Sequence, residues 1–303
     1  MPQVLIGREV ALIGGVGREQ ECEAGCRKQH HGMQFSHAES IPREREIARL
    51  GGGPYTGSVL LLHNPIPASR IRLIVFDLDG TLIDSRLDLT NSINAMLAEF
   101  GRQPLPEEII ATYIGDGAGM LVRRALGDPE DEPLVENALQ HFLAHYREHK
   151  LDHTYVYPGV FESLEAMQVA PDGVPRKLAV LTNKPIGPSV AICEGLGLSP
   201  YMFRIYGGNS FPTKKPDPEG LNTLIREAEV SPQETLMVGD SSVDILTARR
   251  AGAWALGCRF GMSSHTVEDI PSDCLVDSAS EWAEAMTPES TGQASQFVTA
   301  RKP

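Results

Sequence analysis

The chain has 303 residues, of which 41% are hydrophobic and 22% are charged, and its formal net charge at pH 7 is −13. This length suits one or two folded domains, and the composition is that of an ordinary soluble globular protein. The acidic balance argues against a nucleic-acid-binding protein, which would carry a basic surface. No run of 18 or more apolar residues occurs, so we expect no transmembrane helix and no membrane partner.

The five cysteines are an odd number without the spacing of a disulfide framework. Cys193 and Cys258 lie in apolar stretches, so we expect reduced thiols in the core. The start of the chain lacks a basic segment followed by an apolar stretch, so we expect no signal peptide. A reducing cytoplasm is therefore the expected location.

Residues 1–70 are expected to form a poorly ordered N-terminal extension, because no periodic pattern joins their short apolar runs. Two of these runs could form strands, Val10–Ile13 and Val59–Leu62. The sequence GVG at 15–17 begins like a dinucleotide-binding fingerprint, but position 20 is Gln and no βαβ unit follows, so we interpret it as chance.

The same segment contains a loose set of possible zinc ligands. Cys22 and Cys26 are followed by His30 and His31. The spacing is irregular and no second ligand pair follows, so we do not expect a zinc site there.

A run at 71–76, in which five of the six residues are apolar, predicts a strand buried on both faces, of the kind found in parallel sheets. Asp77 and Asp79 follow it directly. Residues i and i+2 of an extended chain point to one side, so both carboxylates can face one site. Their mutual repulsion calls for a cation, and Mg²⁺ prefers oxygen ligands of this kind.

The next segment, residues 86–155, predicts a small all-helical insert. Apolar residues recur at helical spacing over Leu87–Phe100, and further helices are predicted from Pro106, over Leu121–Leu126 and over Leu134–Tyr146. Three histidines recur every four residues in the last of these helices and just beyond it. That face could bind a metal, but we expect it to be exposed or to pack against other helices: His141, His145 and His149.

Strands and helices alternate after the insert, which predicts βαβ units and a parallel sheet. We assign residues 71–85 and 156–286 to this α/β core and residues 287–303 to a flexible tail. Helices are predicted at Val160–Met167, Ser189–Leu196, Pro218–Ala228 and Asp244–Ala251. Strands are predicted at Lys177–Leu181, Arg204–Tyr206, Thr235–Val238 and Ala253–Cys258, with a possible edge strand at 275–276.

Polar residues follow three further strands of this predicted sheet. They are Thr182 and Asn183 after one strand, Lys215 before a helix, and Asp240 with Asp244 after another strand. A phosphate ester with Mg²⁺ fits this set, because Lys215, the Thr182 hydroxyl and backbone N–H groups can hold phosphate oxygens. We expect two neighbouring lysines to be solvated rather than catalytic: Lys184 and Lys214.

Four ordered motifs resemble those of the haloacid dehalogenase-like hydrolases: DLDGT at 77–81, TN at 182–183, KPDP at 215–218 and GDSSVD at 239–244. The resemblance extends over about residues 71–285. It implies an α/β fold with a Rossmann-like parallel sheet flanked by helices, and a small all-helical cap domain inserted after the first strand.

The resemblance also implies roles for the site residues. Asp77 would be the nucleophile that forms an aspartyl-phosphate, and Asp79 would be the general acid and base. Dehalogenases of the family lack the second aspartate, so Asp79 favours phosphate-ester chemistry. Mg²⁺ would be held by the Asp77 carboxylate, the Asp79 backbone carbonyl and Asp240, with Asp244 as a ligand or a support behind the ligands.

The insert resembles the cap of bacterial phosphoglycolate phosphatases, most closely over residues 113–126. Closure of such a cap would exclude water and let its residues contact the leaving group. Gly115 and Gly117 suit a loop that approaches a small substrate closely. This chain has Asn209 where that subfamily usually has Asp, which removes a charge and could alter substrate fit or metal tuning.

The sequence therefore predicts a Mg²⁺-dependent phosphatase for a small phosphate ester, with 2-phosphoglycolate as first choice, acting as a monomer or homodimer. Other activities stay open: a phosphosugar mutase of the β-phosphoglucomutase type, or a phosphatase for a sugar phosphate, a nucleotide or pyrophosphate. A non-catalytic binding protein that uses the cap as an interaction surface is a more distant alternative. The intact set of motifs weighs against it.

Overall fold

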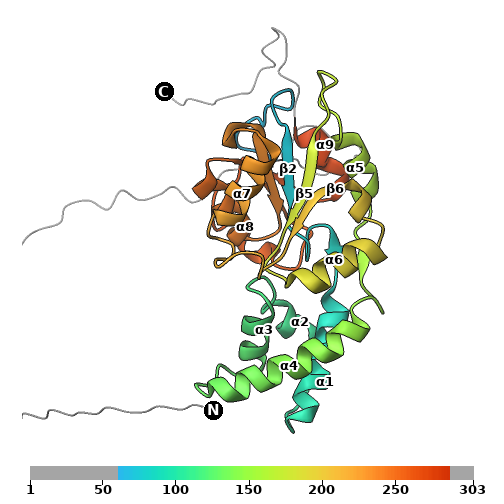
Figure 1. Cartoon of the computed structure of the whole chain (residues 1–303), viewed down its shortest axis with the longest axis vertical. Helices are drawn as coiled ribbons and strands as arrows, with labels where there is room; N and C mark the ends of the chain where they lie inside the picture. The colour runs from blue at the N-terminus through green and yellow to red at the C-terminus, as the bar shows by residue number, and fades with distance from the viewer. Residues whose placement is uncertain (1–60, 287–303) are drawn as a thin grey trace, which may run out of the picture. The chain divides into compact units, whose positions relative to one another are not determined.

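The computed structural model describes residues 61–286, and their main feature is one seven-stranded sheet (Figure 1). Its strands are β1 (Leu61–Leu62), β2 (Leu73–Phe76), β5 (Lys177–Leu181), β6 (Met202–Tyr206), β7 (Thr235–Gly239), β8 (Trp254–Cys258) and β9 (Cys274–Val276). They lie in the order β1-β9-β8-β7-β2-β5-β6. All neighbours are parallel except β1, which pairs antiparallel with β9. The predicted parallel α/β core is confirmed.

Helices cover both faces of the sheet: α5 (Val160–Met167), α6 (Ile186–Gly195), α7 (Glu219–Ala228), α8 (Ser242–Ala251) and α9 (Trp282–Ala285). Figure 1 shows α7 and α8 on one face and α5 and α9 on the other. Alternate side chains of β2 pack on opposite faces of the sheet. Leu73 and Val75 pack with the core residues of α7 and α8, whereas Ile74 and Phe76 pack with those of α5 and α9.

The position of β2 determines where the site forms. It lies between β5 and β7, with Phe76 opposite Val180 on one side and Val238 on the other. The chain passes from β2 to β5 and β6, and then crosses to β7 on the opposite side. Such a change of direction opens a crevice at the carboxyl ends of the strands, where open α/β sheets bind their ligands.

The predicted helical insert is present between β3 (Ile83–Asp84) and β4 (Tyr155–Val156), which pair antiparallel. Figure 1 shows its helices grouped apart from those that flank the sheet. The last two helices run longer than the apolar pattern indicates, because their polar ends leave no periodic signal; Asp131, for example, caps the last of them by accepting from Leu134 N at 3.0 Å. The helices of the insert are α1 (Arg86–Glu99), α2 (Glu107–Ala111), α3 (Ala118–Ala125) and α4 (Glu132–His149).

The histidines of α4 contact other residues of the insert. His145 Nδ1 lies 3.0 Å from Ser92 Oγ, His149 Nδ1 lies 2.8 Å from Asp152, and the His141 ring packs edge-on against Phe100. They form no cluster suited to a metal ion within the described residues. Three buried cysteines are free thiols, as expected for the first two: Cys193, Cys258 and Cys274.

Residues 61–70 belong to the folded core, so the core begins earlier than the sequence analysis placed it, at residue 71. Their strand β1 pairs with β9, and Asn64 Nδ2 donates to Asp273 Oδ1 at 3.0 Å. Ile66 is fully buried, and Arg176 Nη2 donates to the Ala68 carbonyl at 2.6 Å. The possible strand at Val59–Leu62 is confirmed over its described residues as β1, but a strand this short has no periodicity that could reveal its pairing with β9.

Several features predicted from the sequence lie outside the described residues. They are the possible strand at 10–13, the GVG sequence, the cysteine and histidine pairs before residue 32, and the tail at 287–303. Within residues 61–286, no helix combines the length and the apolarity needed to cross a bilayer.

Candidate active site

The site begins with Asp77, which extends the central strand β2 by one residue. Its backbone N–H donates to the Val238 carbonyl at 2.9 Å, which continues the pairing with β7. Thr182 and Asp240 follow the two neighbouring strands directly. In-register parallel pairing brings these three positions to the same edge of the sheet, as the sequence predicted.

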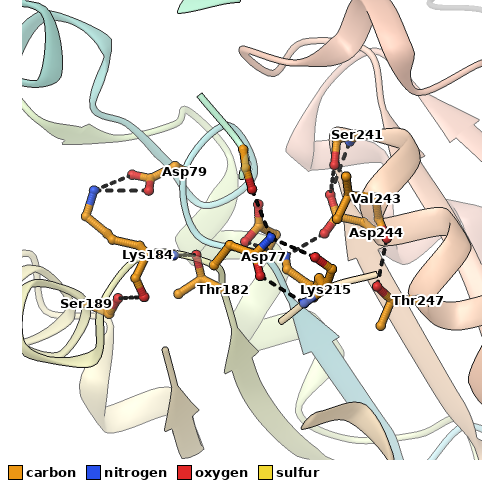
Figure 2. A network of polar contacts seen from close by, with 12 residues as sticks. Asp77, Asp79, Thr182, Lys184, Ser189, Lys215, Ser241, Val243, Asp244 and Thr247 are labelled. Atoms are coloured by element: carbon orange, nitrogen blue, oxygen red, sulfur yellow. Dashed lines mark hydrogen bonds and ion pairs between the residues drawn. The ribbon is translucent and has the colours of Figure 1, made fainter. Parts of the chain in front are cut away.

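Lys215 is buried between two carboxylates, although it comes from a loop beyond β6. Its Nζ lies 2.8 Å from Asp77 Oδ1 and 2.6 Å from Asp244 Oδ1, and its side chain is 3% exposed (Figure 2). Burial alone would lower the pKa of Lys215, but Asp244 and Asp77 outweigh it and the pKa is raised. Lys215 is therefore a fixed positive charge beside Asp77.

Asn183 holds the loop that carries Lys215. Its Oδ1 accepts from Lys215 N at 2.9 Å, and its Nδ2 donates to the carbonyls of Lys215 and Gly115, each at 3.0 Å. The side-chain amide is thus engaged with backbone on both sides. A phosphate contact by Asn183 would have to use its backbone N–H.

Asp240 and Asp244 are placed by the β7–α8 turn. Ser241 donates from Oγ and N to Asp244 Oδ2, at 2.6 and 3.2 Å, which orients this carboxylate in the first turn of α8. Asp240 Oδ2 accepts from Ser263 N at 2.8 Å. A glycine is needed nearby, because a Cβ at Gly80, where φ is +90°, would lie 2.1 Å from Asp240 Oδ2.

Asp77, Asp240 and Asp244 form a carboxylate cluster that suits a metal ion. Each offers one oxygen, and these oxygens lie within 4.8 Å of one another. Burial raises the pKa of Asp77 to about 6; the charge of Lys215 opposes this rise and that of Asp244 adds to it. Burial also raises the pKa of Asp240 well above its usual range, and the charges of Asp244 and Asp77 add to the effect.

The oxygen ligands point to the kind of cation that this cluster would take. Lys215 Nζ lies 2.8 Å from Asp77 Oδ1, and no other donor among residues 61–286 forms a hydrogen bond to that oxygen. An all-oxygen set of this charge fits Mg²⁺.

Asp79 has different partners from Asp77. Its Oδ1 accepts from Ser85 Oγ at 2.6 Å, and Lys184 Nζ lies 3.0 Å from both of its carboxylate oxygens. Figure 2 shows Asp79 and Lys184 on one side of the site, and Asp77, Lys215 and Asp244 on the other. The two aspartates therefore lie in distinct environments, which suits distinct chemical roles.

The expectation that Lys184 is solvated is wrong. Its side chain is 4% exposed, and its Nζ lies 4.6 Å from the ring centroid of Tyr146 in α4. The burial follows from tertiary contacts with Asp79 and the helical insert, neither of which is close to Lys184 in sequence. Lys214 is exposed, as expected.

The core and the insert enclose one pocket beside these residues. Asp77, Asp79 and Thr182 line it from the core, and the predicted Gly115 and Gly117 line it from the insert. Thr182 is buried, with its Oγ1 accepting from Lys184 N at 3.2 Å. The remaining lining is largely apolar: Leu89, Ile114, Ala118, Leu121, Phe142, Leu143, Tyr146, Pro185 and Pro188, together with Asn183 and Lys184.

Sequence reasoning missed four contributors to the site. Ser85 and Lys184 each lie within six residues of a recognised motif residue, so proximity was the one available signal. Tyr146 and Ser263 come from distant segments, and no sequence pattern marks them.

Asn209 lies outside this pocket, where its exposed Oδ1 accepts from Ile186 N at 2.8 Å, so it caps the start of α6.

Comparisons with known proteins agree with this geometry. The family model described as haloacid dehalogenase-like hydrolase matches residues 74–257. A phosphoglycolate phosphatase of Chromobacterium violaceum is 38% identical over 71% of this chain and 96% of its own length. One from Rhodospirillum rubrum is also 38% identical, over 68% of this chain and 87% of its own.

Solved structures give the same result for the fold. The crystal structure of a protein described as a predicted phosphoglycolate phosphatase from Haemophilus somnus is similar with a TM-score of 0.67 and 30% identity. The similarity covers 72% of this chain and 99% of that one.

Proposed function

Because this chain belongs to the haloacid dehalogenase-like hydrolase family, we propose that it is a Mg²⁺-dependent phosphatase that hydrolyses 2-phosphoglycolate to glycolate and phosphate. The observation that carries the proposal is the separation of the two aspartates. Asp77 lies beside Lys215 in a carboxylate cluster, and Asp79 lies apart with Ser85 and Lys184. The names of the curated relatives support the choice of substrate.

In the proposed first step, an Asp77 carboxylate oxygen attacks phosphorus and the bond from phosphorus to the ester oxygen breaks. Asp79 in its protonated form gives its proton to the departing alkoxide, which leaves as the alcohol of glycolate. Lys215 and Thr182 bind phosphoryl oxygens and orient them for the attack.

In the second step, Asp79 takes a proton from a water molecule, whose oxygen attacks the phosphorus of the aspartyl-phosphate. The bond between phosphorus and the Asp77 oxygen breaks, which releases phosphate and restores both aspartates to their starting forms. Bound Mg²⁺, held by the Asp77, Asp240 and Asp244 carboxylates and the Asp79 backbone carbonyl, would offset the negative charge of the phosphoryl group.

We further propose that residues 86–155 act as a cap over this site. The insert supplies Gly115, Gly117 and Tyr146 to the pocket, and Asn183 contacts its Gly115 carbonyl. A cap in this position would exclude bulk water from the aspartyl-phosphate until the leaving group departs. We expect the enzyme to act in the cytoplasm, as a monomer or homodimer.

A panel of phosphate esters with and without Mg²⁺ tests the proposal, with the Asp77→Asn variant beside the native enzyme. We expect Mg²⁺-dependent phosphate release from 2-phosphoglycolate, lost in Asp77→Asn. Isomerised sugar phosphate without phosphate release would replace the phosphatase with a mutase. A preference for a nucleotide, a sugar phosphate or pyrophosphate would replace the substrate, and the absence of turnover would favour a binding protein.

A further inference from the structure

Lys184 is the cationic group of the pocket. Among the described residues that line the pocket, it is the only basic one, whereas Lys215 is buried between Asp77 and Asp244. Its side chain is held at the end of β5, 4% exposed, and reaches the pocket beside Asp79. A buried lysine on a pocket wall has paid a desolvation cost that a bound anion offsets.

The position of Lys184 places it on the leaving-group side of the site. Its Nζ is 3.0 Å from both oxygens of Asp79, the residue proposed to protonate the ester oxygen. Lys215 instead lies 2.8 Å from Asp77, the proposed nucleophile, and so serves the phosphoryl side. The two lysines therefore face the two ends of a short substrate.

Tyr146 offers a second donor at the same place, from the insert. Its ring lies under Lys184 Nζ at 4.6 Å, and it lines the pocket while 2% exposed. Lys184 is the one described residue with which its buried hydroxyl interacts. A hydroxyl both accepts and donates, so the proton of this one is available to a ligand.

We propose that Lys184 and Tyr146 form a carboxylate subsite that selects phosphate monoesters of short hydroxy acids. This inference rests on the proposed function and deepens it by naming the residues that recognise the leaving group. A carboxylate one carbon away from the ester oxygen lies within reach of a cation beside Asp79. Lys184 is placed for this role by geometry, with its Nζ between the Asp79 carboxylate and the Tyr146 ring at the pocket wall.

The subsite also couples recognition to catalysis. Without substrate, Lys184 holds both oxygens of Asp79. A substrate carboxylate that binds Lys184 competes with Asp79 and leaves the Asp79 side chain available to the ester oxygen. An uncharged leaving group cannot compete in this way. It therefore neither binds Lys184 nor frees Asp79 from Lys184.

The test compares kcat/KM for 2-phosphoglycolate and for ethyl phosphate, which has a methyl group in place of the carboxylate. We expect Lys184→Met to lower the ratio of the two values about 10- to 100-fold, the effect of one charge-assisted hydrogen bond. Tyr146→Phe should lower it about 3- to 10-fold. Lys150→Met, a control at a lysine of the insert that does not line the pocket, should leave the ratio unchanged.

Two results would overturn the subsite. Equal losses on both substrates in Lys184→Met would mean that Lys184 acts through Asp79 alone. An equal fall of the ratio in Lys150→Met would mean that the general electrostatic field, and no local contact, favours the anion. Tyr146→Phe keeps the test informative if Lys184→Met fails to fold. Failure of the native enzyme to hydrolyse any phosphate ester would instead overturn the proposed function.

Discussion

Lys215 Nζ lies 2.8 Å from Asp77 Oδ1 and is buried with it, on the opposite side of the site from the pair formed by Lys184 and Asp79. Each proposed catalytic carboxylate thus has its own lysine. The pairing gives Asp77 a permanent positive neighbour while Asp79 has a partner that a substrate can displace. We expect the two lysines to differ accordingly in their effects on activity.

Lys215→Met should lower kcat for every phosphate ester, by about 100-fold or more, because a phosphoryl-binding charge is lost whatever the leaving group. The variant leaves two buried carboxylates without their cation, which should cost about 3–5 kcal/mol of stability. Steady-state kinetics and urea unfolding measure the two effects. A variant with native kcat would remove Lys215 from the site, and Lys150→Met on the insert serves as a control.

Asp79→Asn should lower kcat for 2-phosphoglycolate about 100- to 10,000-fold, because the alkoxide leaving group then departs without a proton. p-Nitrophenyl phosphate has a far better leaving group, so its first step should be much less affected. We expect a burst of nitrophenolate followed by slow turnover, since Asp79 is still needed to activate water. Equal losses in the burst and in the steady-state rate would contradict these roles.

Mg²⁺ should stabilise the protein more at about pH 7.5 than at about pH 5. The pKa of Asp77 is raised from 3.8 to about 6 in the folded protein without metal, so the folded state binds more protons than the unfolded state between these values. Stability of the metal-free protein therefore falls as pH rises from about 4 through about 6, and it regains that loss when pH falls. Asp240, also raised, acts in the same direction.

The measurement is the melting temperature with and without Mg²⁺ at both pH values. Above the raised pKa the carboxylates are charged and bind the cation, whereas at lower pH protons compete with it. Asp240→Asn is the matched variant and should lose most of the Mg²⁺ effect. An equal Mg²⁺ effect at both pH values, or none at either, would contradict a metal site in the cluster.

A truncation that removes residues 1–66 should be less stable than one that removes residues 1–60. The difference consists of β1, which pairs with β9, and of Ile66, which is fully buried. Burial of a side chain of this size contributes about 1.5–3 kcal/mol. Unfolding of the two truncated proteins in urea gives the difference directly. Equal stabilities would mean that the pairing of β1 contributes nothing.

The central strand and the site around Asp77 could be predicted because the information is local. Six residues of which five are apolar, placed directly before a carboxylate, indicate a buried strand, and parallel pairing then brings Thr182, Asp240 and Lys215 to its end. Those residues sit at strand ends and helix starts, which leave clear patterns in the sequence.

The rest depends on contacts between distant segments. Lys184 is buried because Asp79 and Tyr146 surround it. Asp79 lies 105 residues before Lys184 in the sequence, and Tyr146 belongs to α4 of the insert. The general tendency of lysine to be exposed gave the wrong prediction. Similarly, β1 exists because β9 offers it an edge, and Ser263 reaches Asp240 from a loop without any pattern.

The most direct test of the account is to detect the aspartyl-phosphate at Asp77 and to locate the water oxygen after a single turnover. With enzyme in excess over 2-phosphoglycolate in ¹⁸O-labelled water with Mg²⁺, attack of water on the phosphorus of an aspartyl-phosphate puts the label in phosphate. In a companion experiment, repeated turnover of a substrate with ¹⁸O in its phosphoryl oxygens should leave the Asp77 carboxylate unlabelled, because Asp77 keeps its own oxygen when its bond to phosphorus breaks. Rapid quenching with borohydride should convert the aspartyl-phosphate to homoserine, found by mass spectrometry at position 77. Homoserine at Asp77, absent without substrate, is the predicted result; phosphate release with no modification at Asp77 would contradict the account.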